Sequence, residues 1–432
     1  MPRSRSARLS LGLHVAAAPL TATAEEHVDV AALMSSPPAL VRWVQDHHTG
    51  VAAARARLGQ ARADTDAAGL FQNPALDASV SNYPLGKTNP PGLPLRDSLI
   101  ASVGLSQTFE LGKRGPRMTS AELREQASRE DLTTTLLESV ADARTALAKV
   151  AWARERAAIL DESLAASRRG LALEHTRLEH GDMSGNDFRR LELEDVALEA
   201  DVARAHAELD ASELDCAAVM RARCDLAEGW GAVLDAAALL PATLAPPAQA
   251  VTERPDLRSL ALQQRSAETD AVLARRRAIP DVNVRLGYTQ DQFTISGDMP
   301  RSLALTLTLP LPMFDHGQAD EARAVARAKE LSVQHDGRLV TLRAEAEGLV
   351  ERSRTLDATL ARLTDDALPK SAAVLESTEK ALHQGQVALT DLLLARRTHL
   401  GLRLSVLDLR FERFTVRSTL RKDLALDAGL SG

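Results

Sequence analysis

The two halves of the chain repeat the same landmarks in the same order, at an offset of about 204 residues. In each half, a short segment that begins at a proline is followed by a second short segment that ends at a glycine. A long helical stretch comes next, and then a turn that contains a glycine and an aspartate. Three collinear landmarks at a nearly constant offset predict a duplicated unit of helix, hairpin and long helical hairpin. The landmarks are 73–76 with 279–282, 104–115 with 306–317, and Leu178, Gly181 and Asp187 with Leu382, Gly385 and Asp391.

The stretch 116–180 is typical of a very long helix. It has no proline after its first residue, Gly170 is its one interior glycine, and apolar residues recur at steps of three and four. As a single helix it would be on the order of 100 Å long. Much of its apolar seam is alanine, which allows close approach but buries little area, so we expect coiled-coil packing against several neighbours.

Four short segments with a period of two interrupt this helical background. In each, apolar residues alternate with small or polar ones, which gives one apolar and one polar face. Their lengths suit tilted membrane strands of about 9–11 residues, and their Pro-, Gly- and Asp-rich connections predict two hairpins. The predicted strands cover about 73–83, 99–111, 279–289 and 302–312.

A membrane interpretation of these strands requires an oligomer. Four strands cannot close a barrel, because even the smallest bacterial barrels have about eight. Half of the aromatic residues lie in or beside the four segments, as girdles at the two lipid–water boundaries would require. The alternative for the same pattern is an ordinary two-layer sheet with a soluble core.

Composition and the N-terminus exclude some classes of protein. The net charge is −7 without any block of Lys or Arg, which gives no support to a nucleic-acid surface. No run approaches the roughly 18 apolar residues of a membrane-spanning helix. A positive start, a short apolar stretch and Ala22-Thr23-Ala24 predict a signal peptide at 1–24. The repeats would then cover 25–228 and 253–432, joined by the proline-broken linker 229–252.

Several motifs in order make the chain similar to the TolC-like outer-membrane efflux proteins (the outer membrane factor family). The stretch LGKRGPR at 111–117 is most similar to the branch that serves cobalt–zinc–cadmium resistance pumps. The first-half turn departs from the second, because Phe188, Arg189 and Arg190 stand where the second has three leucines. The motifs are FQNPAL at 71–76, LSQTFELGKRGPR at 105–117, ERPDL at 253–257, LP at 368–369, QG at 384–385 and TDLLLA at 390–395.

The resemblance implies a mainly α protein with a β-barrel part. Four strands from each chain of a homotrimer would form a twelve-stranded β-barrel on a long α-helical barrel, with an equatorial region built from 229–252 and the C-terminal tail. Its expected function is a passive, gated exit duct across the periplasm and outer membrane of a Gram-negative bacterium, with heavy-metal cations as the expected cargo. Its expected partners are a periplasmic adaptor protein and an inner-membrane pump of the resistance-nodulation-division type. The alternative is a soluble periplasmic coiled-coil scaffold.

The turns 181–187 and 385–391 would be the periplasmic tips of the helical hairpins. A glycine C-cap followed by an acid in the first turn of the next helix explains Asp187 and Asp391 on local grounds. By resemblance Gly181, Asp187, Gly385 and Asp391 belong to the tip aperture and adaptor docking region. Asp391 would also line the closed mouth, where threefold symmetry makes three carboxylates into a ring that attracts cations.

The alternation of the strands also predicts which side chains face the inside of a barrel. Arg285, Thr306 and Thr308 are expected to face the lumen, whereas Leu305 and Leu307 are expected to face lipid.

The sequence contains none of the common catalytic or metal-binding motifs. The sequence has no helical zinc-hydrolase motif, P-loop, nucleophile elbow or dinucleotide fingerprint, so we expect no enzyme, cofactor or metal site. His47 with His48, and His175 with His180, could touch a cation but are expected to be solvated. Cys216 and Cys224 would lie about 12 Å apart on one helix, so two buried thiols are expected unless the helix breaks between them.

Overall fold

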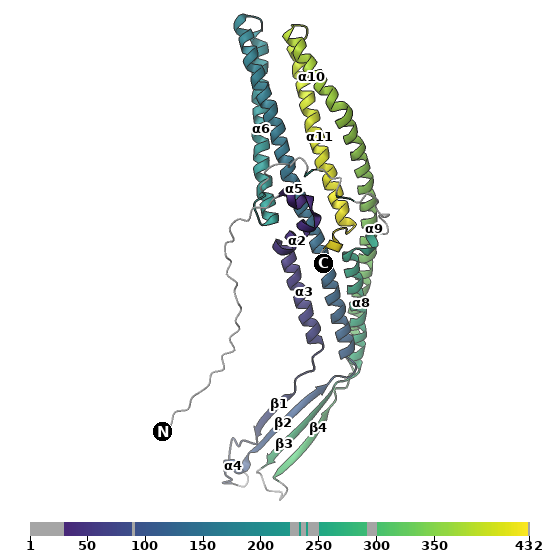
Figure 1. The fold of residues 1–432 in the computed structure, drawn as a ribbon. Helices are drawn as coiled ribbons and strands as arrows, with labels where there is room; N and C mark the ends of the chain where they lie inside the picture. Colours follow the sequence, from purple (N-terminus) through teal and green to yellow (C-terminus); the bar gives the residue numbers. More distant parts are fainter. Residues whose placement is uncertain are drawn as a thin grey trace, which may run out of the picture.

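The protein is a long rod with a four-stranded sheet at one end and two helical hairpins at the other (Figure 1). The computed structural model describes residues 30–88, 91–224, 233–234, 239–240, 250–291 and 300–430. The predicted signal peptide and most of the predicted linker 229–252 lie outside these residues. None of the described helices combines the length and the apolar character that crossing a membrane would require.

The two halves share the order helix, two strands and long helical hairpin, which confirms the predicted duplication and fold class. The first half has α1 (Val30–Ser35), α2 (Pro37–His47), α3 (Thr49–Ala68), β1 (Ala75–Ser81), α4 (Leu95–Ser98), β2 (Ile100–Phe109), α5 (Arg114–His180) and α6 (Gly185–Met220). The second has η3 (Val251–Glu253), α8 (Pro255–Arg275), η4 (Arg276–Ala278), β3 (Val282–Asp291), β4 (Arg301–Thr308), α9 (Gln318–Arg362), η5 (Leu363–Ala367), α10 (Leu368–His383), α11 (Leu389–Asp423) and η6 (Ala428–Leu430).

Helix α5 is the spine of the rod. It runs for 67 residues without a break, as the absence of proline predicts. It packs against α3 and α8 toward the sheet and against α6 and α11 toward the hairpin tips. Ala143, Ala148 and Ala151 are fully buried, so the alanine seam lies inside the rod, against the neighbouring helices.

The main hydrophobic core lies in the middle of the rod, where α2, α5, α6 and α11 meet. Phe414 of α11 is the largest of its fully buried side chains, and Leu147 of α5 has no exposed surface. Smaller clusters lie under the C-terminal tail and at the hairpin tips. The helical body therefore has an interior of its own within one chain.

The sheet combines strands from both halves in the order β1-β2-β3-β4, with every pair antiparallel. β1 with β2 and β3 with β4 are the two predicted hairpins, and the ten-residue β2–β3 pairing joins the repeats. β4 ends at Thr308, earlier than predicted, because Pro310 and Pro312 have no N–H to donate to a ladder.

A change of helix type marks the proline inside the second long rod. Residues Leu363–Ala367 form a π-helical turn directly before α10, whose second residue is Pro369. Proline cannot donate to the carbonyl four residues earlier and its ring crowds that carbonyl. The wider turn accommodates the ring, so the rod continues through a local irregularity instead of ending.

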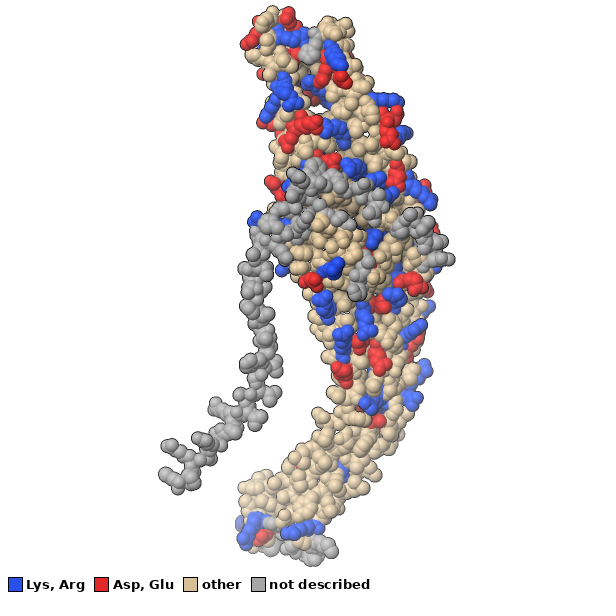
Figure 2. All heavy atoms as spheres, in the orientation of Figure 1, with Lys and Arg blue, Asp and Glu red and all other residues tan. Residues whose placement is uncertain are grey.

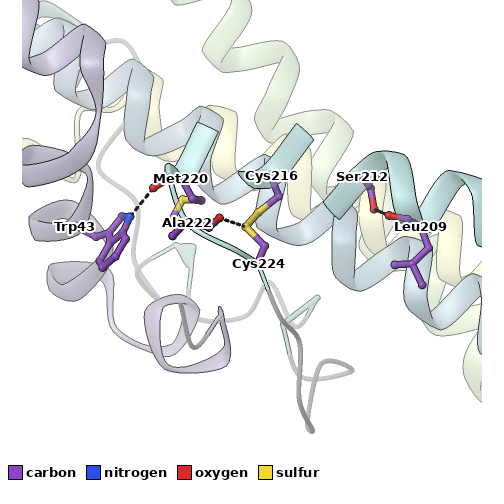
Figure 3. Close-up of a disulfide and its surroundings, with 7 residues drawn as sticks. All are labelled: Trp43, Leu209, Ser212, Cys216, Met220, Ala222 and Cys224. Atoms are coloured by element: carbon purple, nitrogen blue, oxygen red, sulfur yellow. Dashed lines mark hydrogen bonds between the residues drawn. A yellow bond between two sulfur atoms is a disulfide. The ribbon is translucent and has the colours of Figure 1, made fainter. Parts of the chain in front are cut away.

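A disulfide joins Cys216 and Cys224, so the expectation of two buried thiols is wrong (Figure 3). Helix α6 ends at Met220, and Arg221 adopts a left-handed φ of 59°, which turns the chain back on itself. The two Cα atoms come within 6.1 Å, well inside disulfide reach. Beside the bridge, the indole N–H of Trp43 donates to the Met220 carbonyl and ties α2 to the same helix end.

Candidate functional site

The residues predicted to be functional lie at opposite ends of the rod. Gly181 and Gly385 lie in the two hairpin turns, and Asp187 and Asp391 lie in the first turns of the helices that follow, α6 and α11. Arg285, Thr306 and Thr308 lie in the sheet at the other end (Figure 1).

Both hairpin tips begin with the same helix stop. Gly181 and Gly385 adopt left-handed φ values of 83° and 71°, which glycine tolerates without a steric penalty. The N–H of Asp182 donates to the Arg177 carbonyl, and the N–H of Gln386 donates to the Ala381 carbonyl, each at 2.9 Å. These six-to-one bonds satisfy end carbonyls of both helices, which confirms the capping interpretation of the two glycines.

The two tip aspartates differ in what holds their carboxylates. At the first tip, Ser184 caps α6: its hydroxyl accepts from the N–H of Asp187 at 3.1 Å and donates to the Asp187 carboxylate at 2.8 Å. Arg190 adds an ion pair to that carboxylate at 3.6 Å. The Asp187 side chain is therefore held by two neighbours of its own helix start.

At the second tip the N-cap is Ala388, which has no side-chain oxygen. The Asp391 carboxylate accepts one hydrogen bond, from the N–H of Ala388 at 3.2 Å. Within the described part of the chain no cation pairs with it, and the residue is exposed. Asp391 therefore leaves most of its lone pairs free for a ligand or for symmetry copies of itself.

The tips share one small hydrophobic cluster. Leu191 of α6 packs with Leu382, Leu389 and Leu392 of the second tip. An ion pair between Arg397 of α11 and Glu194 of α6 crosses the same gap. The structure thus brings the four predicted tip residues to one end of the molecule on two hairpins that contact one another.

The sheet has one apolar face and one polar face, as its alternation predicts. Arg285 lies opposite Thr306 in the β3–β4 register, and Thr308 lies opposite Asn283, so all four belong to one face. Leu305 and Leu307 belong to the other face and are 69% and 67% exposed in the single chain.

Asp77 of β1, which the sequence analysis missed, pairs with Arg285. It is the one acidic residue of β1 and falls in the polar phase.

Buried ion pairs hold the C-terminal tail against the middle of the rod, and this cluster was also missed. Asp427 accepts from Arg144 of α5 at 3.2 Å and from Arg421 of α11 at 2.8 Å, and all three residues are buried. Burial lowers the pKa of the Arg144 guanidinium, and the nearby Asp427 carboxylate offsets part of that effect.

A second cluster lies beside it. Arg254, at the start of the second half, donates to Asp256 at 2.9 Å and to Asp423 at 3.2 Å. Burial acts to raise the pKa of Asp256, but hydrogen bonding and attraction to Arg254 outweigh it and hold that pKa below its usual value. Both clusters fasten chain segments far apart in sequence, and neither shows the geometry of a binding site.

Three of the four histidines singled out in the sequence make local contacts, whereas the Nδ1 of the fourth, His48, is buried without a hydrogen-bond partner among the described residues. His47 lies 2.9 Å from the Trp43 carbonyl and His180 lies 2.8 Å from the Thr176 carbonyl, in each case one turn earlier on the same helix. His175 lies 3.6 Å from Glu179. Among the described residues, no group of three or more His, Cys, Asp or Glu is placed to hold a metal ion.

The chain matches a known protein family and resembles solved structures. The model of the family described as "Outer membrane efflux protein" matches residues 41–215 and 247–425. No curated protein matches.

Three solved structures illustrate the similarity in fold. CusC shares 18% identity over 90% of this chain and 92% of its own, with a TM-score of 0.76. The outer-membrane channel OprN shares 18% identity over 95% and 98%, with a TM-score of 0.75. The outer membrane protein VceC of Vibrio cholerae shares 18% identity over 92% and 96%, with a TM-score of 0.71.

Proposed function

The chain belongs to the outer membrane efflux protein family, and we propose that it works as the exit channel of a tripartite efflux system. It lies in the outer membrane of a Gram-negative bacterium and extends into the periplasm. Members of the family are channels rather than enzymes. The observation that carries the proposal is the family match to both repeats of one rod, whose far end is a sheet with an exposed apolar face.

The working unit is a homotrimer. In one chain β1 and β4 are the edges of an open sheet, and each has only one neighbouring strand. Three chains joined edge to edge would form a closed barrel of about twelve strands, which removes all unpaired edges. The exposed leucines of β4 would then contact lipid, while Arg285, Thr306 and Thr308 would line the lumen.

The hairpin tips are the proposed aperture and docking region for the periplasmic adaptor and the inner-membrane pump, a pump of the resistance-nodulation-division type. Three copies of Asp391 around a closed mouth would form a carboxylate ring that favours cations. The carboxylate of Asp391 accepts one hydrogen bond, from the N–H of Ala388, and this supports the role. The carboxylate of Asp187 already accepts a hydrogen bond from Ser184 and forms an ion pair with Arg190.

The domain limits follow the same proposal: a signal peptide at 1–24, repeats at 25–228 and 253–432, and an equatorial segment at 229–252 with the C-terminal tail. The tail's ion pairs to α5 and α11 support its place in the middle of the rod. The proposed cargo is heavy-metal cations, on the resemblance of 111–117 to the cobalt–zinc–cadmium branch; the fold likeness to CusC is consistent with that branch.

Two measurements test the proposal. Heat-resistant trimers in the outer-membrane fraction are expected, and a protein found only as a soluble periplasmic species would contradict the channel function. A deletion strain grown on a panel of metal salts and drugs should become sensitive to cobalt, zinc or cadmium. Sensitivity to drugs alone would leave the channel standing and overturn the proposed cargo.

A further inference from the structure

An arginine crosses a neighbouring strand on the polar face of the sheet. Arg285 lies on β3 and its partner Asp77 lies on β1, with β2 between them. The Arg285 Nε donates to one Asp77 carboxylate oxygen at 2.9 Å, and Nη2 pairs with the other. This two-pronged pairing fixes the plane of the guanidinium as well as its position.

Two glycines make room for that crossing. Gly104 of β2 stands opposite both Asp77 and Gly287 in the two ladders. A Cβ added at Gly104 would lie 2.5 Å from Nη2 and 2.7 Å from Cζ of Arg285, and one at Gly287 would lie 2.9 Å from Nη1. The guanidinium therefore lies against the bare backbone of β2, whereas strand side chains ordinarily stand perpendicular to the sheet.

The pair has few charged neighbours on its own sheet. The only other charged residues in the four strands are Asp291 and Arg301, at the end of the sheet where β3 ends and β4 begins. Arg285 and Asp77 keep 32% and 45% of their side chains exposed, so both remain in contact with whatever fills that side of the sheet. Their charges cancel only while they stay together.

The geometry points to Asp77 as a residue that sets the ion selectivity and free width of the pore, by holding Arg285 flat against the wall. This inference rests on the proposed trimeric channel, in which the polar face lines the lumen. Threefold symmetry then places three neutral pairs at one level. Without Asp77 the same level carries three unpaired guanidinium ions, and rings of cationic side chains favour the passage of anions.

Single-channel recording in planar bilayers under a KCl gradient tests the charge. Asp77→Asn should move the reversal potential toward that of chloride, and Arg285→Gln, which leaves three carboxylates unpaired, should move it toward that of potassium. The double variant should return close to the wild-type value. Ser79→Asn is the matched control, since Ser79 lies on the same face of β1 two residues away and bonds to Ser102.

Gly104→Ala tests the width, because it changes no charge. A methyl group at 2.5 Å from Nη2 forces the guanidinium off the wall, so single-channel conductance should fall while the reversal potential stays near wild type. Gly287→Ala should have a smaller effect, since its nearest contact is the movable Nη1 at 2.9 Å.

The outcomes separate this inference from the proposed function. Pores in which Asp77→Asn and Arg285→Gln behave like Ser79→Asn overturn the role of the pair and leave the channel intact. A wild-type protein that forms no pore overturns the channel, and the inference with it. If Asp77→Asn does not assemble, as judged by loss of the heat-resistant trimer, Arg285→Gln alone decides through the predicted opposite shift.

Discussion

The sheet and the helical body of this protein depend on different surroundings. All eight residues of β4 are exposed in the single chain, whereas Val140, Leu147 and Ala151 in the middle of α5 have no exposed surface. Figure 2 shows Lys, Arg, Asp and Glu spread over the helical body but sparse over the sheet. The body carries its own core, and the sheet has an apolar face that nothing in its own chain covers. One chain thus contains a part with its own buried core and a part that, in the proposed trimer, would be covered by neighbouring chains and lipid.

The largest expected effect comes from charging the apolar face of the sheet. Arginine on the lipid face costs up to about 2–4 kcal/mol per site at the bilayer midplane and less toward the interfaces, and a trimer carries Leu307→Arg three times. We expect this variant to lose the heat-resistant trimer in the outer-membrane fraction. Thr306→Arg, one residue earlier on the other face, should assemble and only narrow the pore. Equal tolerance of both substitutions would contradict the assignment of the two faces.

The stability of the helical body should depend on its own buried ion pairs, whatever surrounds the sheet. Asp427→Ala leaves Arg144 and Arg421 buried without their shared carboxylate, and breaking such a pair costs about 3–5 kcal/mol. Thermal unfolding followed by helical circular dichroism should show a clear destabilisation.

Glu376→Ala is the control for this variant, because its ion pair with Lys380 is exposed to solvent, and exposed ion pairs contribute little to stability. If both variants unfolded at the same temperature, the ion pairs of the C-terminal tail would not stabilise the helical body.

Removing the disulfide should have an intermediate effect on stability, confined to the end of α6. Closing so short a loop stabilises a protein by about 2–3 kcal/mol, so Cys216→Ser with Cys224→Ser should loosen the end of α6. Arg221 and Arg223 are exposed within the loop, and trypsin should cut there faster in the double variant. In the wild-type protein the two cut fragments should stay together on a gel until a reductant is added. Fragments that separate without reductant would show that the thiols are free.

The smallest expected effect on stability is at the tips, where the body ends in water. Neutralising either aspartate removes a favourable charge from a helix N-terminus, worth about 0.3–1 kcal/mol. Asp391→Asn should also reduce cation selectivity and weaken block by divalent ions in single-channel recordings. Asp187→Asn should do much less, because Ser184 and Arg190 already hold that carboxylate. Unchanged selectivity and block in the Asp391→Asn trimer would leave helix capping as its only role.

Elements whose signal is local could be predicted from sequence. The uninterrupted α5, the alternation of β3 and the glycine stops at Gly181 and Gly385 each depend on residues within one or two turns of each other. The same local rules led to a wrong expectation for Cys216 and Cys224. The helix break between them rests on Arg221 in a left-handed conformation, which non-glycine residues rarely adopt and which no motif announced.

By itself, the sequence determined the duplicated order of elements, the two faces of the sheet and the positions of the tips, because periodicity and caps act between near neighbours. Only the tertiary structure decided which distant charges meet. Asp77 and Arg285 are 208 positions apart, and Arg144 and Asp427 are 283 apart. Such pairs depend on strand order and helix packing, so a lone Asp or Arg in the sequence carries no sign of its partner. The different hydrogen bonding of the Asp187 and Asp391 carboxylates has a local cause, because Ser184 and Ala388 lie only three positions before them. Both residues could be read from the sequence, but only the structure showed that the Ser184 hydroxyl bonds to the Asp187 carboxylate.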